Sequence, residues 1–230
     1  NEKEDSLLWP EKYSKEKLFK IRDRSPFYFY SQMQQNPIVE GGTTIKLKWF
    51  RFYSELPKFD EIYQSWDTAV KIGDQHDYSA CGTIGVVNTK FGKQFYLIDL
   101  FRDKLIYPEL KAKQEELQLK FNPKRVLVED KASGQQLIQD AKAKGNNKVE
   151  GCKAIKNKEG RVEEKNGLVD EMYSGNLFFD ESANYYTDLK AELLSFPNGT
   201  NDDCIDMLSQ AINYINKPRA SLYIGGVKVN

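Results

Sequence analysis

Acidic side chains occur at three places in the sequence where a strand or helix is expected to begin or end. The first place is Asp67 and the second is the pair Glu129 and Asp130, and each follows a run of residues with β-strand character. The third place is the first turn of an amphipathic helix, and its acids are Asp202, Asp203 and Asp206. Each group alone has an ordinary explanation, because acids close turns, cap helices and complement the helix dipole.

Taken together, the three groups favour metal chemistry. Oxygen ligands from distant parts of a chain suit Mg²⁺ or Mn²⁺ better than zinc, and the sequence offers a single histidine, His76, as a nitrogen ligand. Two such ions about 4 Å apart can activate water and stabilise the leaving oxygen in phosphodiester hydrolysis. Asp77, which follows Asp67 in the same loop, could add a ligand through water, although a turn role is its ordinary interpretation.

Composition and charge limit the other function classes. The chain has 230 residues, 40% of them hydrophobic and 30% charged, which is enough for one sizeable globular domain and an appendage. Its 34 basic and 34 acidic residues cancel, so only the local distribution of charge can indicate a nucleic-acid partner. No apolar run approaches the roughly 20 residues of a membrane span, and no membrane partner is expected. The three cysteines form no CxxC pair, which argues against structural zinc and disulfides and fits a reducing cytosol.

Hydrophobic periodicity predicts a mixed sheet with helices on both faces. Three β-rich runs at 62–66, 80–87 and 94–101 predict an antiparallel meander, with a glycine-containing turn at 90–93. Further strands are expected at 124–130, 149–155 and 176–180, and helices at 109–121, 135–144, 160–174, 182–195 and 202–216. This order predicts an α/β fold in which an antiparallel three-strand meander is followed by parallel strands.

Residues 1–58 differ in character from the rest of the chain. A short helix capped by Ser14 is expected to run to Arg24, and a proline and a glycine pair then indicate an extended connector. Residues 46–53 could form a strand or a short helix. Their aromatic side chains either present a surface to a missing partner domain or, as we favour, pack against the fold. We expect residues 1–58 to be a connector and residues 59–230 to be the main domain.

The three acidic segments, in this order, resemble a known family. They are residues 65–69 (SWDTA), 128–134 (VEDKASG) and 202–211 (DDCIDMLSQA), and they are joined by a similar connector at 30–37 with glycines at 41–42. The sequence resembles the C-terminal nuclease domain of the large terminase subunit of tailed bacteriophages, which has a ribonuclease H-like fold. Each short segment has little specificity alone, whereas the ordered set covers nearly the whole chain.

The resemblance implies a DNA endonuclease that cuts concatemeric viral DNA during genome packaging, with two Mg²⁺ or Mn²⁺ ions. Asp67 would bridge both ions, Glu129 would be the acid of the second strand with Asp130 as its rival, and Asp203 would be the helix acid. Asp202 and Asp206 would compete with Asp203 or support it. The implied catalytic residues are Asp67, Glu129 and Asp203, and the implied metal ligands also include Asp130, Asp202 and Asp206.

The same resemblance implies partners and a location. Double-stranded DNA and a terminase ATPase domain are the expected partners, the portal and the small terminase subunit are further candidates, and the location is the cytoplasm of the bacterial host. The sequence contains no GxxxxGK[ST] phosphate loop and does not begin with methionine, so we expect the nuclease half of a longer protein. Asn201 stands where the family often has histidine, which puts in doubt a titrating group at that position.

Basic residues are frequent between positions 142 and 161, where seven of them accompany two acids. Contact with DNA phosphates and a solvated loop surface are the two interpretations of this run. Lys131, beside the acid pair, could contact the scissile phosphate or reduce repulsion between the carboxylates. The candidate DNA-binding residues are Lys131, Lys142, Lys144, Lys153, Lys156, Lys158 and Arg161.

Two alternative functions stay open at the level of sequence. Another ribonuclease H-like enzyme, such as a junction resolvase or a transposase-type strand transferase, would prefer four-way junctions or RNA–DNA hybrids. A non-catalytic docking module would bind the portal or the packaging ATPase and would bind no metal.

Overall fold

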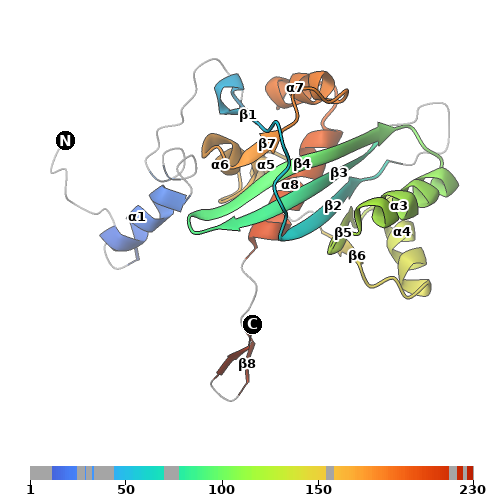
Figure 1. The fold of residues 1–230 in the computed structure, drawn as a ribbon, viewed down its shortest axis with the longest axis horizontal. Coiled ribbons are helices and arrows are strands. Elements are labelled where there is room, and N and C mark those ends of the chain that lie inside the picture. Colours follow the sequence, from blue (N-terminus) through green and yellow to red (C-terminus); the bar gives the residue numbers. More distant parts are fainter. Residues whose placement is uncertain are drawn as a thin grey trace.

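A seven-stranded mixed sheet forms the centre of the molecule (Figure 1). The computed structural model describes residues 12–24, 29, 33, 44–69, 78–153 and 158–217, and the backbone of 222–224 and 227–229. The strands of the sheet are β1 (Arg51–Phe52), β2 (Glu61–Asp67), β3 (Ser79–Thr89), β4 (Gly92–Asp103), β5 (Arg125–Glu129), β6 (Val149–Cys152) and β7 (Leu177–Phe179). Their order across the sheet is β1-β7-β4-β3-β2-β5-β6. Two short strands, β8 (Leu222–Ile224) and β9 (Val227–Val229), pair with each other.

The pairing of the strands confirms the predicted mixed sheet. Strands β2, β3 and β4 form an antiparallel meander, β5 pairs in parallel with β2, and β6 pairs in parallel with β5. On the other side of the meander, β7 pairs in parallel with β4 and β1 pairs in parallel with β7. The meander is therefore the middle of the sheet, and β2 is its link to the parallel strands.

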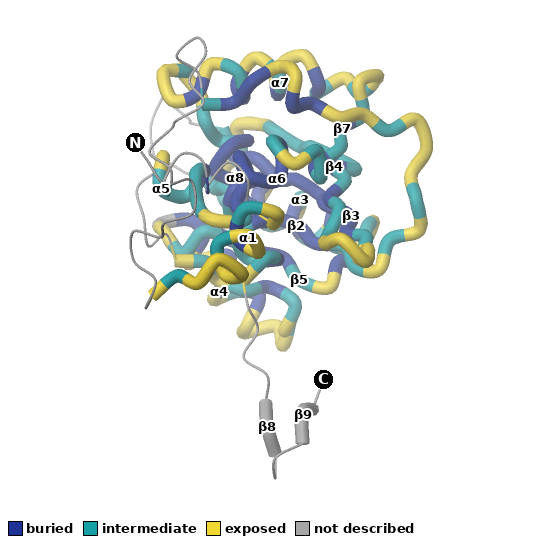
Figure 2. The backbone as a smooth tube through the Cα atoms, turned by 90° about the vertical axis from the view of Figure 1, so that its left-hand side faces the viewer, coloured by how far each residue is buried: buried dark blue, intermediate teal, exposed yellow. Residues whose placement is uncertain are grey.

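Helices cover both faces of the sheet, as the sequence predicts. The described helices are α1 (Lys15–Arg24), the 3₁₀ turn η2 (Leu47–Trp49), α3 (Tyr107–Phe121), α4 (Ala132–Ala143), α5 (Lys158–Val162), α6 (Leu168–Tyr173), α7 (Tyr186–Ser195) and α8 (Asp203–Asn216). Helices α3 and α4 pack on one face around Trp66 and Val128. Helices α6, α7 and α8 pack on the other face around Tyr63 and Ile84. Figure 2 shows the buried positions gathered along α8 and the central strands.

Helix α8 lies directly on the central strands because its apolar residues recur at helical spacing. Ile205, Leu208 and Ile212 are fully buried, which confirms the stripe predicted from the sequence. Gly82 of β3 permits a very close approach, since a Cβ atom at this position would overlap the sulfur of Met207. The first two turns of α8 are thereby held against the middle of the sheet.

The helix predicted over residues 160–174 is wrong as a single element. The chain forms α5 and α6 instead, with a break between them. Asn166 has a left-handed backbone with φ of 57°, and the Gly167 N–H donates to the Glu164 carbonyl at 2.6 Å. A side chain at Gly167 would meet the same carbonyl oxygen at 2.6 Å, so the tight turn requires glycine. The short helix α5 is therefore an independent element, and it carries Arg161.

The described part of the N-terminal region agrees with its predicted local structure. Ser14 accepts a hydrogen bond from the Lys17 N–H at 3.3 Å, which caps α1. Residues 46–53 include both the short helix η2 and the strand β1. Trp49 and Phe50 are buried in the core and pack against the fold, whereas Phe52 is exposed. The glycines and proline of the expected connector fall outside the described residues.

None of the described helices is long and apolar enough to span a membrane.

Candidate active site

Two of the candidate acids lie side by side at the carboxyl ends of neighbouring parallel strands. Trp66 of β2 is opposite Val128 of β5, and Asp67 and Glu129 are the next residues on each strand. Neighbouring strands lie about 4.8 Å apart, so the two backbones are adjacent at this edge. The carboxyl ends of strands in open α/β sheets are a common place for functional residues.

The alternation of side chains turns both acids towards α8. Val128 packs on the face that α3 and α4 cover, so Glu129, the next residue, points to the opposite face. Ser65 contacts α8, and Asp67 is two residues further along the same strand. Asp67 and Glu129 therefore share the face of the sheet on which α8 lies.

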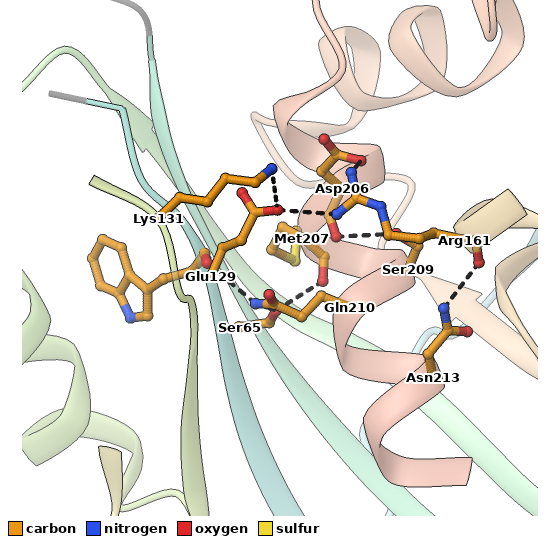
Figure 3. Close-up of polar contacts among 10 residues, drawn as sticks. Ser65, Glu129, Lys131, Arg161, Asp206, Met207, Ser209, Gln210 and Asn213 are labelled. Carbon is orange, nitrogen blue, oxygen red and sulfur yellow. Dashed lines mark hydrogen bonds and ion pairs between the residues drawn. The ribbon is translucent and has the colours of Figure 1, made fainter. Parts of the chain in front are cut away.

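A hydrogen-bonded clamp joins the end of β2 to α8 (Figure 3). The Ser65 hydroxyl donates to the Met207 carbonyl at 2.8 Å and accepts from Gln210 Nε2 at 2.9 Å. Gln210 Nε2 also lies 3.2 Å from the Trp66 carbonyl. Asp206 directly precedes Met207, so this clamp places Asp206 close to the end of β2.

Arg161 connects the strand acid with the helix acid. Its Nη1 atom lies 3.2 Å from Glu129 Oε1 and its Nη2 atom lies 3.0 Å from Asp206 Oδ1 (Figure 3). All three side chains are largely buried, with exposed fractions of 13%, 12% and 8% for Arg161, Glu129 and Asp206. Lys131, whose side chain is 62% exposed, donates to the same oxygen of Glu129 at 2.8 Å. The structure thus brings Glu129 and Asp206 together across one guanidinium group.

Asp203 is held by a different arginine. Arg102 of β4 lies 2.8 Å from Asp203 Oδ2 and 3.3 Å from Glu192 Oε2. The other oxygen of Glu192 accepts hydrogen bonds from the backbone N–H groups of Cys204 and Ile205, at 2.7 Å and 3.2 Å. Glu192 therefore caps α8 from α7, and burial raises the pKa of its carboxyl group.

Asp202 and Asp130 occupy other positions. Asp202 is the N-cap residue of α8, but its side chain makes no capping hydrogen bond, since Glu192 satisfies the helix N-terminus. The Asp130 N–H donates to the Cys152 carbonyl at 2.8 Å. The Asp130 side chain lies towards Gly151 and Ile138, because a Cβ atom at Gly151 would be 3.8 Å from Asp130 Cγ and 3.0 Å from Ile138 Cδ1. Asp130 thus points to the α4 side, away from Glu129.

The donor chemistry of the site fits a hard divalent cation. The side chains on the α8 face that could act as ligands are the carboxylates of Asp67, Glu129 and Asp206, and oxygen ligands suit Mg²⁺ and Mn²⁺. Burial raises the pKa of the nearby Cys152 thiol to about 12. Within the described residues, no three His, Cys, Asp or Glu side chains are gathered closely enough to hold an ion. Asp77 and His76 fall outside the described residues.

The candidate DNA-binding residues are divided between two regions. Lys131 and Arg161 contact Glu129, and Lys153 is exposed beside the end of β6. Lys142 and Lys144 are at the far end of α4, about 15 Å along the helix axis from its first residue. Lys144 pairs there with Glu115 of α3 at 2.5 Å. Lys156 and the side chain of Lys158 fall outside the described residues.

A groove of about 650 Å³ opens beside Arg161. It lies between the edge strand β6 and the helices α5 and α8, and its wall includes Lys153, Arg161, Lys165, Asn213, Tyr214 and Lys217. Four residues of the wall, Lys153, Arg161, Lys165 and Lys217, carry positive charge, and two others, Glu150 and Glu164, carry negative charge. The groove therefore joins the acid pair to a basic surface.

A comparison with protein-family models identifies the family. The model described as the terminase RNaseH-like domain matches residues 64–215. The chain belongs to this family. The match extends from within β2 to beyond β7 and includes Asp67, Glu129, Asp203 and Asp206, and it confirms the resemblance to the nuclease domain of a large terminase subunit. A comparison with curated protein sequences found no match.

Solved structures share the fold of this terminase domain. The large terminase nuclease of the thermophilic phage G20c with bound magnesium is 13% identical, with a TM-score of 0.54, over 76% of this chain and 98% of that chain. The nuclease domain of the Thermus phage P74-26 large terminase is 14% identical, with a TM-score of 0.51, over 74% and 92%. The HK97 bacteriophage large terminase is 11% identical, with a TM-score of 0.52, over 88% and 51%. These similarities confirm the ribonuclease H-like fold.

Sequence reasoning missed several residues that organise the site of this terminase domain. Ser65 and Gln210 are polar residues in an apolar strand and an amphipathic helix, and that contrast was a usable signal. Glu192 lies between Leu189 and Leu193 on the buried side of α7, which was a similar signal. Nothing in the sequence singles out Arg102, because its contacts depend on residues about 90 and 101 positions away.

Proposed function

We propose that this terminase domain is a metal-dependent endonuclease that cuts concatemeric viral DNA during genome packaging. The observation that carries the proposal is that Asp67 and Glu129 end adjacent parallel strands, while Arg161 bridges Glu129 to Asp206 near the start of α8. The G20c terminase nuclease, which shares the fold, has been solved with magnesium and with cobalt bound. Membership of the terminase family and an all-oxygen donor set both support a divalent metal for this chain.

Each acid has a proposed role that follows from its position. Asp67 and Glu129 would hold the ions from two adjacent strand ends, and Asp206 would complete the site from α8. Asp203, which is paired with Arg102 through one oxygen, is the alternative helix acid, and Asp130 and Asp202 would support the site from outside. Bound Mg²⁺ or Mn²⁺ would supply the activation of water and the stabilisation of the leaving oxygen. Lys131 and Lys153 are positioned to contact the phosphates of the substrate strand, with no dependence on base sequence.

The wider setting follows from the family. Double-stranded DNA is the proposed substrate, and a terminase ATPase domain, the portal and the small terminase subunit are the proposed partners. The proposed site of action is the cytoplasm of the bacterial host. We also propose that the connector ends and the nuclease domain begins after residue 58. Trp49 and Phe50 are buried in the core, so the packed part of the fold begins before this boundary.

Cleavage of supercoiled plasmid tests the proposal. Wild type, Asp67→Ala and Asp60→Ala would be compared with Mn²⁺, Mg²⁺ or EDTA. Asp60 is a matched control because it precedes the opposite end of β2, where it accepts a hydrogen bond from the Asn88 N–H at 2.7 Å. We expect nicking and linearisation that require metal, persist in Asp60→Ala and disappear in Asp67→Ala. Cleavage by Asp67→Ala would contradict the proposed site, and a folded wild type that never cuts would favour a docking module.

A further inference from the structure

Arg161 lies between Glu129 and Asp206, and its backbone is anchored to α8. Its backbone carbonyl accepts a hydrogen bond from Asn213 of α8 at 2.9 Å, so the short helix α5 is tied to α8 (Figure 3). Its two terminal nitrogens reach Glu129 and Asp206, and its Nε atom is buried without a hydrogen-bond partner among the described residues. A buried donor without a partner costs free energy, so the bridging conformation of Arg161 leaves one of its donors unsatisfied.

Arg161 and a metal ion would compete for the same pair of carboxylates. Glu129 Oε1 and Asp206 Oδ1 face the guanidinium at 3.2 Å and 3.0 Å, and an ion bound by these oxygens would lie within a few ångströms of a fixed positive charge. The repulsion would be strong in a site that excludes most water. A divalent ion would therefore bind this pair more tightly once the guanidinium has moved away.

The groove beside the site gives the guanidinium a place to go. Arg161 forms part of the groove wall together with Lys153 and Lys165, so a change of side-chain rotamer would bring its charge to the basic surface. There a DNA phosphate would be a good partner, because arginine binds phosphate through two parallel hydrogen bonds. The guanidinium group that pairs with the two acids would then pair with a phosphate of the substrate.

We propose that Arg161 is a positioning residue that takes the place of the cation between Glu129 and Asp206 in the metal-free domain. It leaves that place when a divalent metal binds, and it then faces the groove and the DNA backbone. This inference rests on the proposed metal-dependent function. It assigns to Arg161 a role in metal binding in addition to the phosphate contact expected from its charge alone.

Metal affinity of an arginine variant distinguishes this role from a purely structural ion pair. Mn²⁺ binding by the full chain without DNA would be measured by calorimetry for wild type and Arg161→Gln. We expect the variant to bind Mn²⁺ on the order of tenfold more tightly, because a competing charge is gone, and to unfold at a lower temperature in EDTA. Arg161→Lys keeps the charge and should bind Mn²⁺ with an affinity closer to that of wild type.

Arg125→Gln is the matched control, since it makes the same substitution at the other end of β5. Arg125 pairs with Glu150 at 3.5 Å, and we expect its replacement to leave Mn²⁺ affinity unchanged. An equal or weaker affinity in Arg161→Gln would overturn the inference while the metal-dependent function stands. If neither wild type nor Arg161→Gln binds Mn²⁺, both proposals fail.

A second measurement uses the wild type and does not depend on the folding of a variant. The Nε–H resonance of Arg161, assigned by comparison with Arg161→Lys, would be followed by NMR during a Mg²⁺ titration. We expect it to shift as Mg²⁺ saturates the site, while the resonance of Arg125 stays in place. An unchanged Arg161 resonance at saturating Mg²⁺ would overturn the inference.

Discussion

The hydroxyl group of Ser65 donates a hydrogen bond of 2.8 Å to the backbone carbonyl of Met207, which is 142 positions away in the sequence. This bond joins the strand that ends in Asp67 to the helix that carries Asp206. Because Gln210 donates to the same hydroxyl at 2.9 Å, the junction has two bonds on one buried side chain. The relative position of two proposed metal ligands therefore depends on a residue that is not itself a ligand.

Replacement of Ser65 by alanine should weaken the fold and the active site together. The change removes the hydrogen bond to the Met207 carbonyl and leaves the Gln210 amide with the Trp66 carbonyl alone, at a fully buried position of β2. We expect a loss of about 1–3 kcal/mol in the free energy of unfolding, measured by urea denaturation, and slower plasmid cleavage. Ser182→Ala, at an exposed turn, should change neither quantity. Full activity in Ser65→Ala would show that the clamp does not position Asp206.

Gly134 should tolerate no side chain, because α4 begins directly against the strand that carries Glu129. A Cβ atom at Gly134 would overlap the backbone carbonyl oxygen of Glu129. We expect Gly134→Ala to lower the free energy of unfolding by about 1–3 kcal/mol and to abolish most cleavage, because the strand end must shift. Gly145→Ala is the comparison at the other end of α4, where φ is 72° and the space is open. It should cost about 1 kcal/mol without affecting cleavage, and a similar loss of activity in both variants would contradict this explanation.

The two acids on the first turns of α8 should differ in their effect on metal binding. Asp206 shares Arg161 with Glu129, whereas Asp203 is paired with Arg102 and lies near Glu192. We expect Asp206→Asn to weaken Mn²⁺ binding at least about tenfold, and Asp203→Asn to weaken it less while lowering thermal stability. Calorimetry and thermal unfolding of both variants provide the measurement. The reverse order of Mn²⁺ affinities would mean that Asp203 leaves Arg102 and binds the ion itself.

Stability should depend on pH through Glu171, which is distant from the proposed ligands in the sequence. Burial raises its pKa from 4.5 to about 7, although Asn176 and Asn216 donate hydrogen bonds to its oxygens. The folded state therefore binds this proton more tightly than the unfolded state, so the contribution of Glu171 is fully present below pH 4.5 and is lost as the pH rises through 7.

Glu171→Gln should flatten that dependence. Between pH 5 and pH 8 the free energy of unfolding of the wild type should fall on the order of 2–3 kcal/mol further than that of the variant. Urea denaturation of both proteins across this pH range provides the measurement. Glu181→Gln, on an exposed turn, should keep the wild-type slope. Parallel curves for wild type and Glu171→Gln would contradict the assignment.

The sequence by itself determined the elements and the chemistry of the strand ends. The β-rich character of 62–66, 80–87 and 94–101 is a local property, and it predicted the meander and the place of Asp67. The 3.6-residue spacing of Ile205, Leu208 and Ile212 predicted α8 in the same way. The order of the three acidic segments was enough to indicate the terminase family, which the match over residues 64–215 confirms.

Only the tertiary structure decided which charges meet. The break at Gly167 frees α5 from α6 and brings Arg161 between Glu129 and Asp206, which are 32 and 45 positions away from it in the sequence. Long-range packing likewise pairs Asp203 with Arg102 and leaves Lys142 and Lys144 at the far end of α4. The physical reason is that periodicity records which side of an element is buried, whereas contacts between elements depend on how closely the buried faces approach one another.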